Sequence, residues 1–429
     1  MEALIFIATC ITMIIFVLTK PKITLGKLHL NSYWVITLSG AVLMLLIKHK
    51  DVGIIAKSLL SDSAVNPIKI LTLFLSMTFI SVFLDVTGLF SYLAGTVLKS
   101  AGKNQFKLFF FLYITVSVLT VFTSNDIIIL TFTPFICYFC KRANISPVPY
   151  LFAEFVAANT WSMFLIIGNP TNIYIASYFG TDFLTYIKEM AVPTVFSGVT
   201  SFVILFMLFK KQLSINITPE ETPVSPIKFK ALLIIGVIHL AVCTVILSVC
   251  SYIGLEMWYI SLASALSLCV CTLVYCIIKR KSPLILLMAA ERIPFQLIPF
   301  VISMFVLVLE LEISGTAELI GRFLSFGNEA AVYTFASAIS SNILNNIPMS
   351  VLFGSVINAS GAGVLAQYGS IIGSNLGALI TPIGALAGIM WTDILATHGV
   401  EMSAGTFVKY GCTVAFPALI ASGISLYLF

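Results

Sequence analysis

Long apolar runs, separated by short polar segments, dominate the amino-acid sequence. Most of these runs are close to the ~20 residues that an α-helix needs to cross the hydrocarbon core of a bilayer. The runs cover residues 3–19, 31–47, 70–95, 107–140, 149–180, 190–209, 230–252, 257–278, 296–313, 330–357, 366–396 and 405–429. The pattern predicts an all-α polytopic membrane protein with about ten spans.

Four of the runs are interrupted by polar residues. The breaks are rich in asparagine, serine, threonine, glycine and proline. The interrupted runs are 107–140 (broken at 123–126), 149–180 (broken at 168–172), 330–357 (broken at 341–348) and 366–396 (broken at 373–375 and at 381–384). We expect 107–140 and 330–357 to be re-entrant hairpins, and 149–180 and 366–396 to be broken spans.

Basic residues orient these runs, because Lys and Arg concentrate in cytoplasmic loops. Three lysines lie just before or at the start of the first hairpin, and Lys141 and Arg142 follow it. This hairpin is therefore expected to enter and leave the membrane on the cytoplasmic side. Loop 48–69 carries four lysines that the same count places outside, and we interpret part of it as an interfacial helix.

The two halves of the chain show the same order of segments. Residues 1–210 comprise three spans, a hairpin, a broken span and a final span, and residues 230–429 repeat this order. An odd number of crossings separates the two starts, so the halves are predicted to be inverted repeats joined by a cytoplasmic linker, 211–229. Inverted repeats with interrupted helices in matching places are typical of secondary transporters.

Composition supports a membrane location and excludes other classes. The chain has 429 residues, of which 59% are hydrophobic and 10% charged, whereas soluble domains are typically ~25% charged. The net charge of +5 does not indicate nucleic-acid binding, because the basic residues cluster between apolar runs. Neither a metal-ligand set nor a nucleophile–base pair is recognisable, so we expect no enzyme, no metal and no cofactor.

The breaks are the expected substrate site. A helix can be interrupted in hydrocarbon only where the freed backbone groups line a cavity or bind a ligand, and half-helix N-termini carry partial positive charge. The breaks contain no Lys or Arg, so a multiply charged anion would lack a formal countercharge. The candidate substrate-binding residues are Ser124, Asn125, Asn159, Asn169, Thr171, Asn172, Asn342, Asn345, Asn346, Ser374, Asn375 and Thr381.

Acidic residues inside the apolar runs are candidates for ion coupling. Asp126 lies at the tip of the first hairpin and is the preferred candidate, with Asp85 second and H⁺ or Na⁺ as the coupling ion. Glu154 is expected near the membrane boundary, and Glu310 and Glu312 at an interface, because they lie toward the ends of their runs.

The breaks also resemble the arsenical pump membrane protein family of the ion-transporter superfamily, whose wider relatives include anion and citrate permeases. The matching segments are 122–126 with Thr133-Pro134, 340–348, and 373–377 with 381–384. The resemblance covers nearly the whole chain and implies inverted repeats, re-entrant hairpins and proton-coupled export of arsenite or antimonite. The chain departs from the family at Asn159, Asn375 and Leu379, where arsenite pumps commonly carry Asp, Asp and Lys.

The sequence therefore predicts a secondary active transporter in the cell membrane that exports a small oxyanion or neutral hydroxide, most simply arsenite or antimonite. The alternatives are a sodium-coupled carboxylate or other anion carrier and a sodium/proton antiporter. A channel is disfavoured, because the polar groups concentrate in four breaks rather than along a continuous pore. The expected partners are a small inorganic or organic anion and the lipid bilayer, with a homodimer and an ATPase partner subunit left open.

Overall fold

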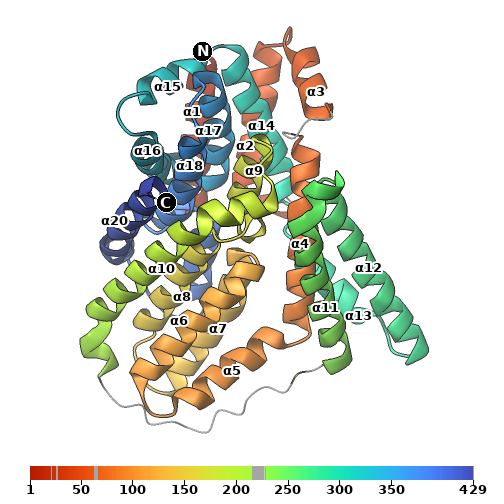
Figure 1. The fold of residues 1–429 in the computed structure, drawn as a ribbon, viewed down its shortest axis with the longest axis vertical. Coiled ribbons are helices and arrows are strands. Elements are labelled where there is room, and N and C mark those ends of the chain that lie inside the picture. The colour runs from red at the N-terminus through yellow and green to blue at the C-terminus, as the bar shows by residue number, and fades with distance from the viewer. Residues whose placement is uncertain (21, 26–27, 62–65, 215–226, 228, 429) are drawn as a thin grey trace.

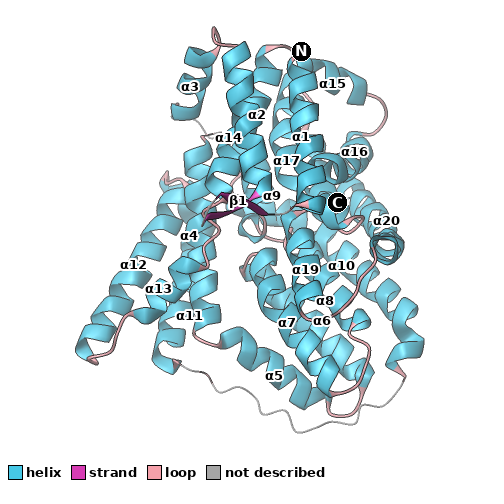
Figure 2. Cartoon of the chain, turned by 180° about the vertical axis from the view of Figure 1, so that it is seen from behind, coloured by secondary structure: helices cyan, strands magenta, loops and turns pink. Residues whose placement is uncertain are grey.

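The computed structural model describes residues 1–20, 22–25, 28–61, 66–214, 227 and 229–428. Within these ranges the chain is almost entirely helical (Figures 1 and 2), with one antiparallel two-stranded hairpin. Strands β1 (Lys22–Leu25) and β2 (Leu28–Asn31) form this hairpin between the first two helices. In Figure 2 it lies near the middle of the molecule, where many of the helix breaks also occur.

Ten α-helices and one short 3₁₀ helix make up the described part of the first half. They are α1 (Glu2–Thr19), α2 (Ser32–Ile47), α3 (Val52–Leu60), α4 (Pro67–Val86), α5 (Leu89–Ala101), α6 (Gln105–Phe122), α7 (Asn125–Arg142), α8 (Val148–Trp161), η1 (Ile166–Gly168), α9 (Pro170–Tyr178) and α10 (Phe183–Leu213). The short amphipathic α3 is the part of loop 48–69 expected to be an interfacial helix.

The described part of the second half also has ten α-helices. They are α11 (Lys230–Val249), α12 (Met257–Ile278), α13 (Leu284–Glu291), α14 (Leu297–Ile313), α15 (Thr316–Leu324), α16 (Glu329–Leu344), α17 (Asn346–Ser360), α18 (Val364–Gly377), α19 (Leu386–Thr397) and α20 (Ala404–Leu428), with 3₁₀ helices η2 (Cys250–Ile253) and η3 (Pro382–Gly384). The order matches the first half helix for helix, from α1 and α11 to α10 and α20. The inverted orientation of the halves stays a prediction, and most of the predicted linker lies outside the described residues.

Six helices in the described part of the chain are individually long and apolar enough to cross a membrane: α4, α6, α10, α11, α12 and α20. The helices α1, α2 and α19 are apolar but shorter, and α14 and α15 form a pair bent by 79°. The protein is therefore a helical, multi-pass membrane protein. The first predicted hairpin pairs the long helix α6 with α7, and the other interrupted runs are built from pairs of shorter helices.

Two bends have a similar local sequence: leucine, an acid, an aliphatic residue, a hydroxyl residue and glycine. The α4–α5 bend follows Leu84-Asp85-Val86-Thr87-Gly88, and the α14–α15 bend follows Leu311-Glu312-Ile313-Ser314-Gly315. Gly88 has φ +96° and Gly315 has φ +73°, a left-handed conformation that glycine adopts at little cost. The sequence pattern treated 70–95 as one apolar run, because a single glycine does not interrupt hydrophobicity.

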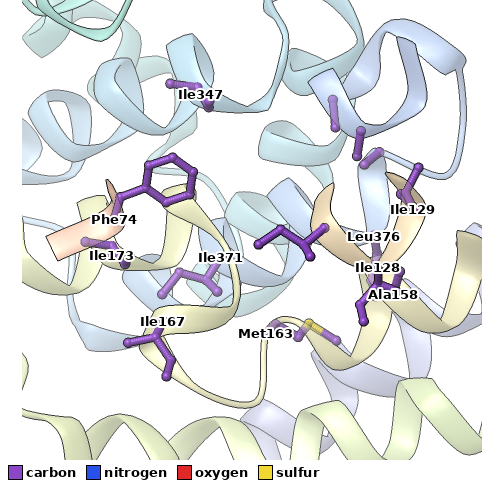
Figure 3. Packing of buried hydrophobic residues seen from close by; sticks show 14 of the residues in the cluster. Phe74, Ile128, Ile129, Ala158, Met163, Ile167, Ile173, Ile347, Ile371 and Leu376 are labelled. Atoms are coloured by element: carbon purple, nitrogen blue, oxygen red, sulfur yellow. The ribbon is translucent and has the colours of Figure 1, made fainter. Parts of the chain in front are cut away.

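The helix breaks meet around a packed apolar core. Figure 3 shows side chains of this core from several of these elements, including Phe74 of α4, Ile128 of α7, Ile173 of α9 and Leu376 of α18. All four are buried. The same region contains the polar side chains of the breaks, so these polar groups are held by a rigid, close-packed frame.

One predicted break is wrong. Ser374 and Asn375 lie in the last turns of α18, which continues to Gly377. The chain leaves the helix only after that residue, and the irregular segment runs to η3. Glycine, serine and asparagine suggested a break at 373–375, but Gly373 and Gly377 allow close contact with α16 instead, where an added Cβ would meet its atoms at 2.8 Å or less.

Candidate functional site

Asn375 is the centre of a buried network that joins the two halves of the chain. Its Oδ1 accepts hydrogen bonds from Ser162 Oγ and from Asn169 Nδ2, both at 2.9 Å. Its Nδ2 donates to Asn172 Oδ1 at 2.8 Å and to the Ile371 carbonyl at 2.9 Å. These side chains are at most 1% exposed. The amide therefore uses one donor and its acceptor to tie α18 to the α8–α9 break, and its second donor bonds within α18.

The α8–α9 break is itself held by these asparagines. Asn169 caps α9, because its Oδ1 accepts from the Thr171 backbone N–H and hydroxyl, each at 3.1 Å. Asn172 Nδ2 donates to the carbonyls of Ser162 and Leu165, which the interruption of the helix leaves free. The structure thus brings the predicted residues Asn169, Thr171 and Asn172 together with Asn375.

A second cluster lies at the tip of the first hairpin. Asn125 Nδ2 donates to Asn159 Oδ1 of α8 at 3.2 Å, and Ser124 Oγ lies 3.5 Å from Asn125 Oδ1. Asn159 Nδ2 also donates to the Phe155 carbonyl, four residues back, at 2.9 Å. Asn375 makes the same bond to the residue four back in α18. Asn159 and Asn375 therefore occupy corresponding places in the two halves, each two residues before the end of its helix.

The tip of the second hairpin forms a third cluster. Thr381 Oγ1 donates to Asn342 Oδ1 at 2.5 Å, and Asn342 Nδ2 donates to the Gly377 carbonyl at 2.9 Å. Asn345 has φ +78° and caps α17, while its Nδ2 donates to the Ile383 carbonyl at 3.0 Å. The 378–385 break is thereby fastened to the hairpin tip.

Two predicted residues are buried with unused hydrogen-bonding capacity. Among the described residues, Asn346 Oδ1 and Ser374 Oγ accept or donate no hydrogen bond, although Asn346 is 3% and Ser374 0% exposed. A buried polar atom without a partner costs about 1–3 kcal/mol. These atoms are available to a ligand or to a different arrangement of the breaks.

A cavity of about 740 Å³ adjoins the first hairpin tip. It lies between β1, α2, α4, α7, the segment joining α13 to α14, and α19, and Ser124 lines it. Five charged residues also line it: Lys22, Asp126, Glu291, Arg292 and Asp393. The acids outnumber the bases. The other predicted substrate residues lie outside this lining and are mostly engaged in the clusters described above.

A smaller cavity of about 180 Å³ is lined, like the larger one, by helices from both halves. Helices α3, α4, α9, α14 and α17 contribute to it, with Glu312 and Ser355 among the lining residues. Under the helix-for-helix match these correspond to α13, α14, α19, α4 and α7, which line the larger cavity. The predicted repeat would therefore make these two cavities, of very different size, counterparts of each other.

Asp85 is ion-paired. Its carboxylate lies 2.6 Å from the Arg292 guanidinium. Arg292 comes from the segment after α13 and lines the larger cavity, as does Lys22 of β1. The absence of basic residues at the breaks therefore does not extend to the cavity, because the fold brings two bases in from segments distant in sequence.

The structure buries two acids inside the protein. Glu154 was expected near the membrane boundary, but it is 0% exposed in the middle of α8. Glu310 is also buried, and Lys48 lies 3.8 Å from it and pairs with Glu2 at the start of α1, so the expected place of Glu310 at a membrane interface stays a prediction. Hydropathy alone does not distinguish them, because the ends of an apolar run need not coincide with the ends of the packed helix.

The comparisons with known proteins place the chain in a family. The citrate transporter family model, CitMHS, matches residues 13–369. The chain belongs to this family. The arsenical pump membrane protein of Escherichia coli K12 is 26% identical over 96% of this chain and 97% of its own length, and a putative arsenical pump membrane protein of Bacillus subtilis is 25% identical over 78% and 81%. The predicted resemblance to arsenical pumps is confirmed.

Solved transporters share the fold. The YdaH transporter of Alcanivorax borkumensis aligns with a TM-score of 0.57 and 14% identity, covering 99% of this chain and 97% of its own. MtrF of Neisseria gonorrhoeae aligns with a TM-score of 0.54 and 13% identity, covering 100% and 94%. Family, relatives and fold agree that this citrate transporter family member is a multi-pass secondary transporter of anions in the cell membrane and not an enzyme.

Proposed function

We propose that this transporter exports arsenite or antimonite. The observation that carries the proposal is the neutral chemistry of the buried clusters, where Asn, Ser and Thr side chains join the two halves around Asn375. Arsenite is mostly the neutral trihydroxide at neutral pH, and its hydroxyl groups can both donate to and accept from amides. The matching arsenical pump relatives support the same substrate.

The charges of the larger cavity also favour a neutral substrate. Three acids and two bases line it, and one of these bases, Arg292, is already paired with Asp85. A di- or tricarboxylate would enter a cavity of net negative charge, and taking an ion out of water costs several kcal/mol. A sodium-coupled carboxylate carrier stays the alternative, because bound cations would reverse this balance.

The proposed driving force is an ion gradient, with Asp126 as the group that meets the coupling ion in the cavity. Asp126 lies in the first turn of α7, directly after the hairpin tip, and lines the cavity. The unequal sizes of the two cavities, about 740 and 180 Å³, support alternating access, in which one cavity closes as the other opens. Such a gradient-driven cycle needs no ATPase partner subunit, and a homodimer stays a prediction.

Expression in a cell that lacks arsenite pumps tests the proposal. We expect resistance to arsenite and antimonite, and arsenite accumulation in everted membrane vesicles. The Asn169→Ala/Asn375→Ala double variant should abolish both, because it removes the amides that link the halves. Cells that stay sensitive, together with vesicles that take up a carboxylate only when sodium is present, would establish the alternative.

A further inference from the structure

Glu154 is a buried acid whose presence is not explained by packing. It lies on α8, its side chain is fully buried, and the Thr133 hydroxyl of α7 lies within hydrogen-bonding distance of both carboxylate oxygens, at 2.8 and 3.0 Å. Within the described part of the chain, no ion pair involves this carboxyl group. An unpaired buried carboxylate costs several kcal/mol, whereas the protonated group avoids most of that cost.

The corresponding helix of the second half, α18, has no acid at the position equivalent to Glu154. When Asn159 of α8 is aligned with Asn375 of α18, Glu154 corresponds to Ser370, because each lies five residues earlier in its helix. Ser370 is also fully buried, and its hydroxyl donates to the Ala366 carbonyl at 2.8 Å. The fold can therefore form this position with a small neutral side chain. A purely structural role does not explain a glutamate in one half only.

The surroundings connect Glu154 to the cavity. Thr133 follows Asp126 by seven residues, two turns or about 10 Å along α7, so the two lie on the same side of that helix. The indole of Trp391 from α19 packs at a tilt against Phe155, the residue after Glu154, with ring centroids 5.0 Å apart. Both α7 and α19 line the larger cavity. A change in the charge of Glu154 would thus act directly on two walls of the cavity.

Few other titratable groups lie near this carboxyl group. Besides Glu154, the buried titratable groups of α7 and α8 are the Cys137 and Cys140 thiols and the Tyr150 phenol, which donates to Gln105 of α6 at 2.7 Å. Helices α10 and α18 also pack on α8, and among the described residues neither provides an ion pair or hydrogen bond to Glu154. A sodium ion would need several oxygen ligands here, while a proton needs one.

We propose that Glu154 is a proton-carrying residue of the transport cycle: its carboxyl group takes a proton from water on one side of the membrane and releases it to water on the other. This inference rests on the proposed function and makes H⁺ the coupling ion. The Thr133 hydroxyl positions the group in both states, because it can donate to the carboxylate and accept from the carboxylic acid.

Glu154→Gln tests the inference, because the amide keeps the shape and the bond to Thr133 but cannot release a proton. In proteoliposomes it should retain arsenite exchange without a gradient and lose accumulation driven by a pH gradient, while Glu154→Asp restores part of it. Glu329→Gln is the matched control, since this acid also accepts a hydrogen bond, from the Gly363 N–H at 3.0 Å, and lines neither cavity. Equal pH-driven accumulation in Glu154→Gln and wild type, or proportional loss of exchange and accumulation, would overturn the inference.

An infrared measurement separates this inference from the substrate assignment. The wild type should show a pH-dependent carbonyl band of a protonated carboxyl group that is lost in Glu154→Gln and kept in Glu329→Gln. If the wild type fails to transport arsenite, the proposed function is wrong, but the band still supports the role of Glu154. If the band is unchanged in Glu154→Gln, the proton-carrying role is wrong whatever the substrate.

Discussion

Replacing Asn375 with alanine should destabilise the transporter by stranding two buried groups. Asn169 Nδ2 and Asn172 Oδ1 would both lose the partner that the structure gives them. Ser162 Oγ would not be stranded, since it also donates to the Asn159 carbonyl at 2.9 Å. At about 1–3 kcal/mol for each stranded group, the expected loss in free energy of unfolding is about 2–6 kcal/mol.

A double-mutant cycle isolates the bond between the halves. Asn169→Ala alone should cost less, because Asn375 Oδ1 still accepts from Ser162, and the main loss is the α9 cap, worth about 1 kcal/mol. In the double variant the Asn169 side chain is absent, so its Nδ2 donor is no longer left without a partner. The loss in free energy of unfolding should therefore be about 1–3 kcal/mol smaller than the sum of the two single-variant losses.

The assay is an equilibrium unfolding titration in mixed detergent micelles. Asn328→Ala is the control, since Asn328 caps α16 at an exposed position, where its Oδ1 accepts from the Ala331 N–H at 3.1 Å. Asn328→Ala should lower the free energy of unfolding by about the 1 kcal/mol expected for the lost cap in Asn169→Ala. Its effect should also be additive with that of Asn375→Ala. If Asn169→Ala and Asn375→Ala were additive to within about 0.5 kcal/mol, the two amides would not be coupled as the geometry requires.

Three further outcomes are expected. Asp126→Asn should lose gradient-driven transport in proteoliposomes and change the apparent KM, because this carboxyl group lines the cavity; near-normal transport would reduce it to a helix cap. Asp85→Asn and Arg292→Gln should show a coupling of about 1 kcal/mol in unfolding titrations, as expected for a partly exposed pair. Ser124→Cys and Asn346→Cys should react with impermeant thiol reagents from opposite faces of the membrane if the halves are inverted, and labelling of both from one face only would exclude that.

Most of the helix order was predictable from the sequence. Hydrophobic runs indicate membrane-embedded helices, and polar breaks indicate where these helices are interrupted. The hairpin breaks before Asn125 and around Asn345 occur where the pattern placed them. The bends at Gly88 and Gly315 were missed, since only the backbone geometry distinguishes a bend from a continuous apolar helix. A comparison of the two halves would have revealed them, as both follow a Leu–acid–aliphatic–hydroxyl–Gly sequence.

The candidate site was only partly predictable. The α8–α9 break supplies Asn169 and Asn172, and the last turns of α18 supply Asn375, so polar residues inside apolar runs were sufficient to find all three. The charges of the cavity could not be predicted, because Lys22 and Arg292 come from a strand and a connecting segment whose sequences show no feature of a binding site. Tertiary packing decides which of these groups come into contact, and these contacts cannot be derived from the spacing of residues along the chain.

The two halves share their neutral chemistry and differ in their acids. Asn159 and Asn375 make the same bond in corresponding helices, but Glu154 corresponds to Ser370, and Asp126 follows Asn125 where Asn346 follows Asn345. A substrate that must be held equally well from either side of the membrane requires groups that both halves provide. A coupling ion requires only one set, because its direction of movement is set by the gradient. The neutral amides are therefore the better candidates for substrate binding, and the acids of the first half for coupling.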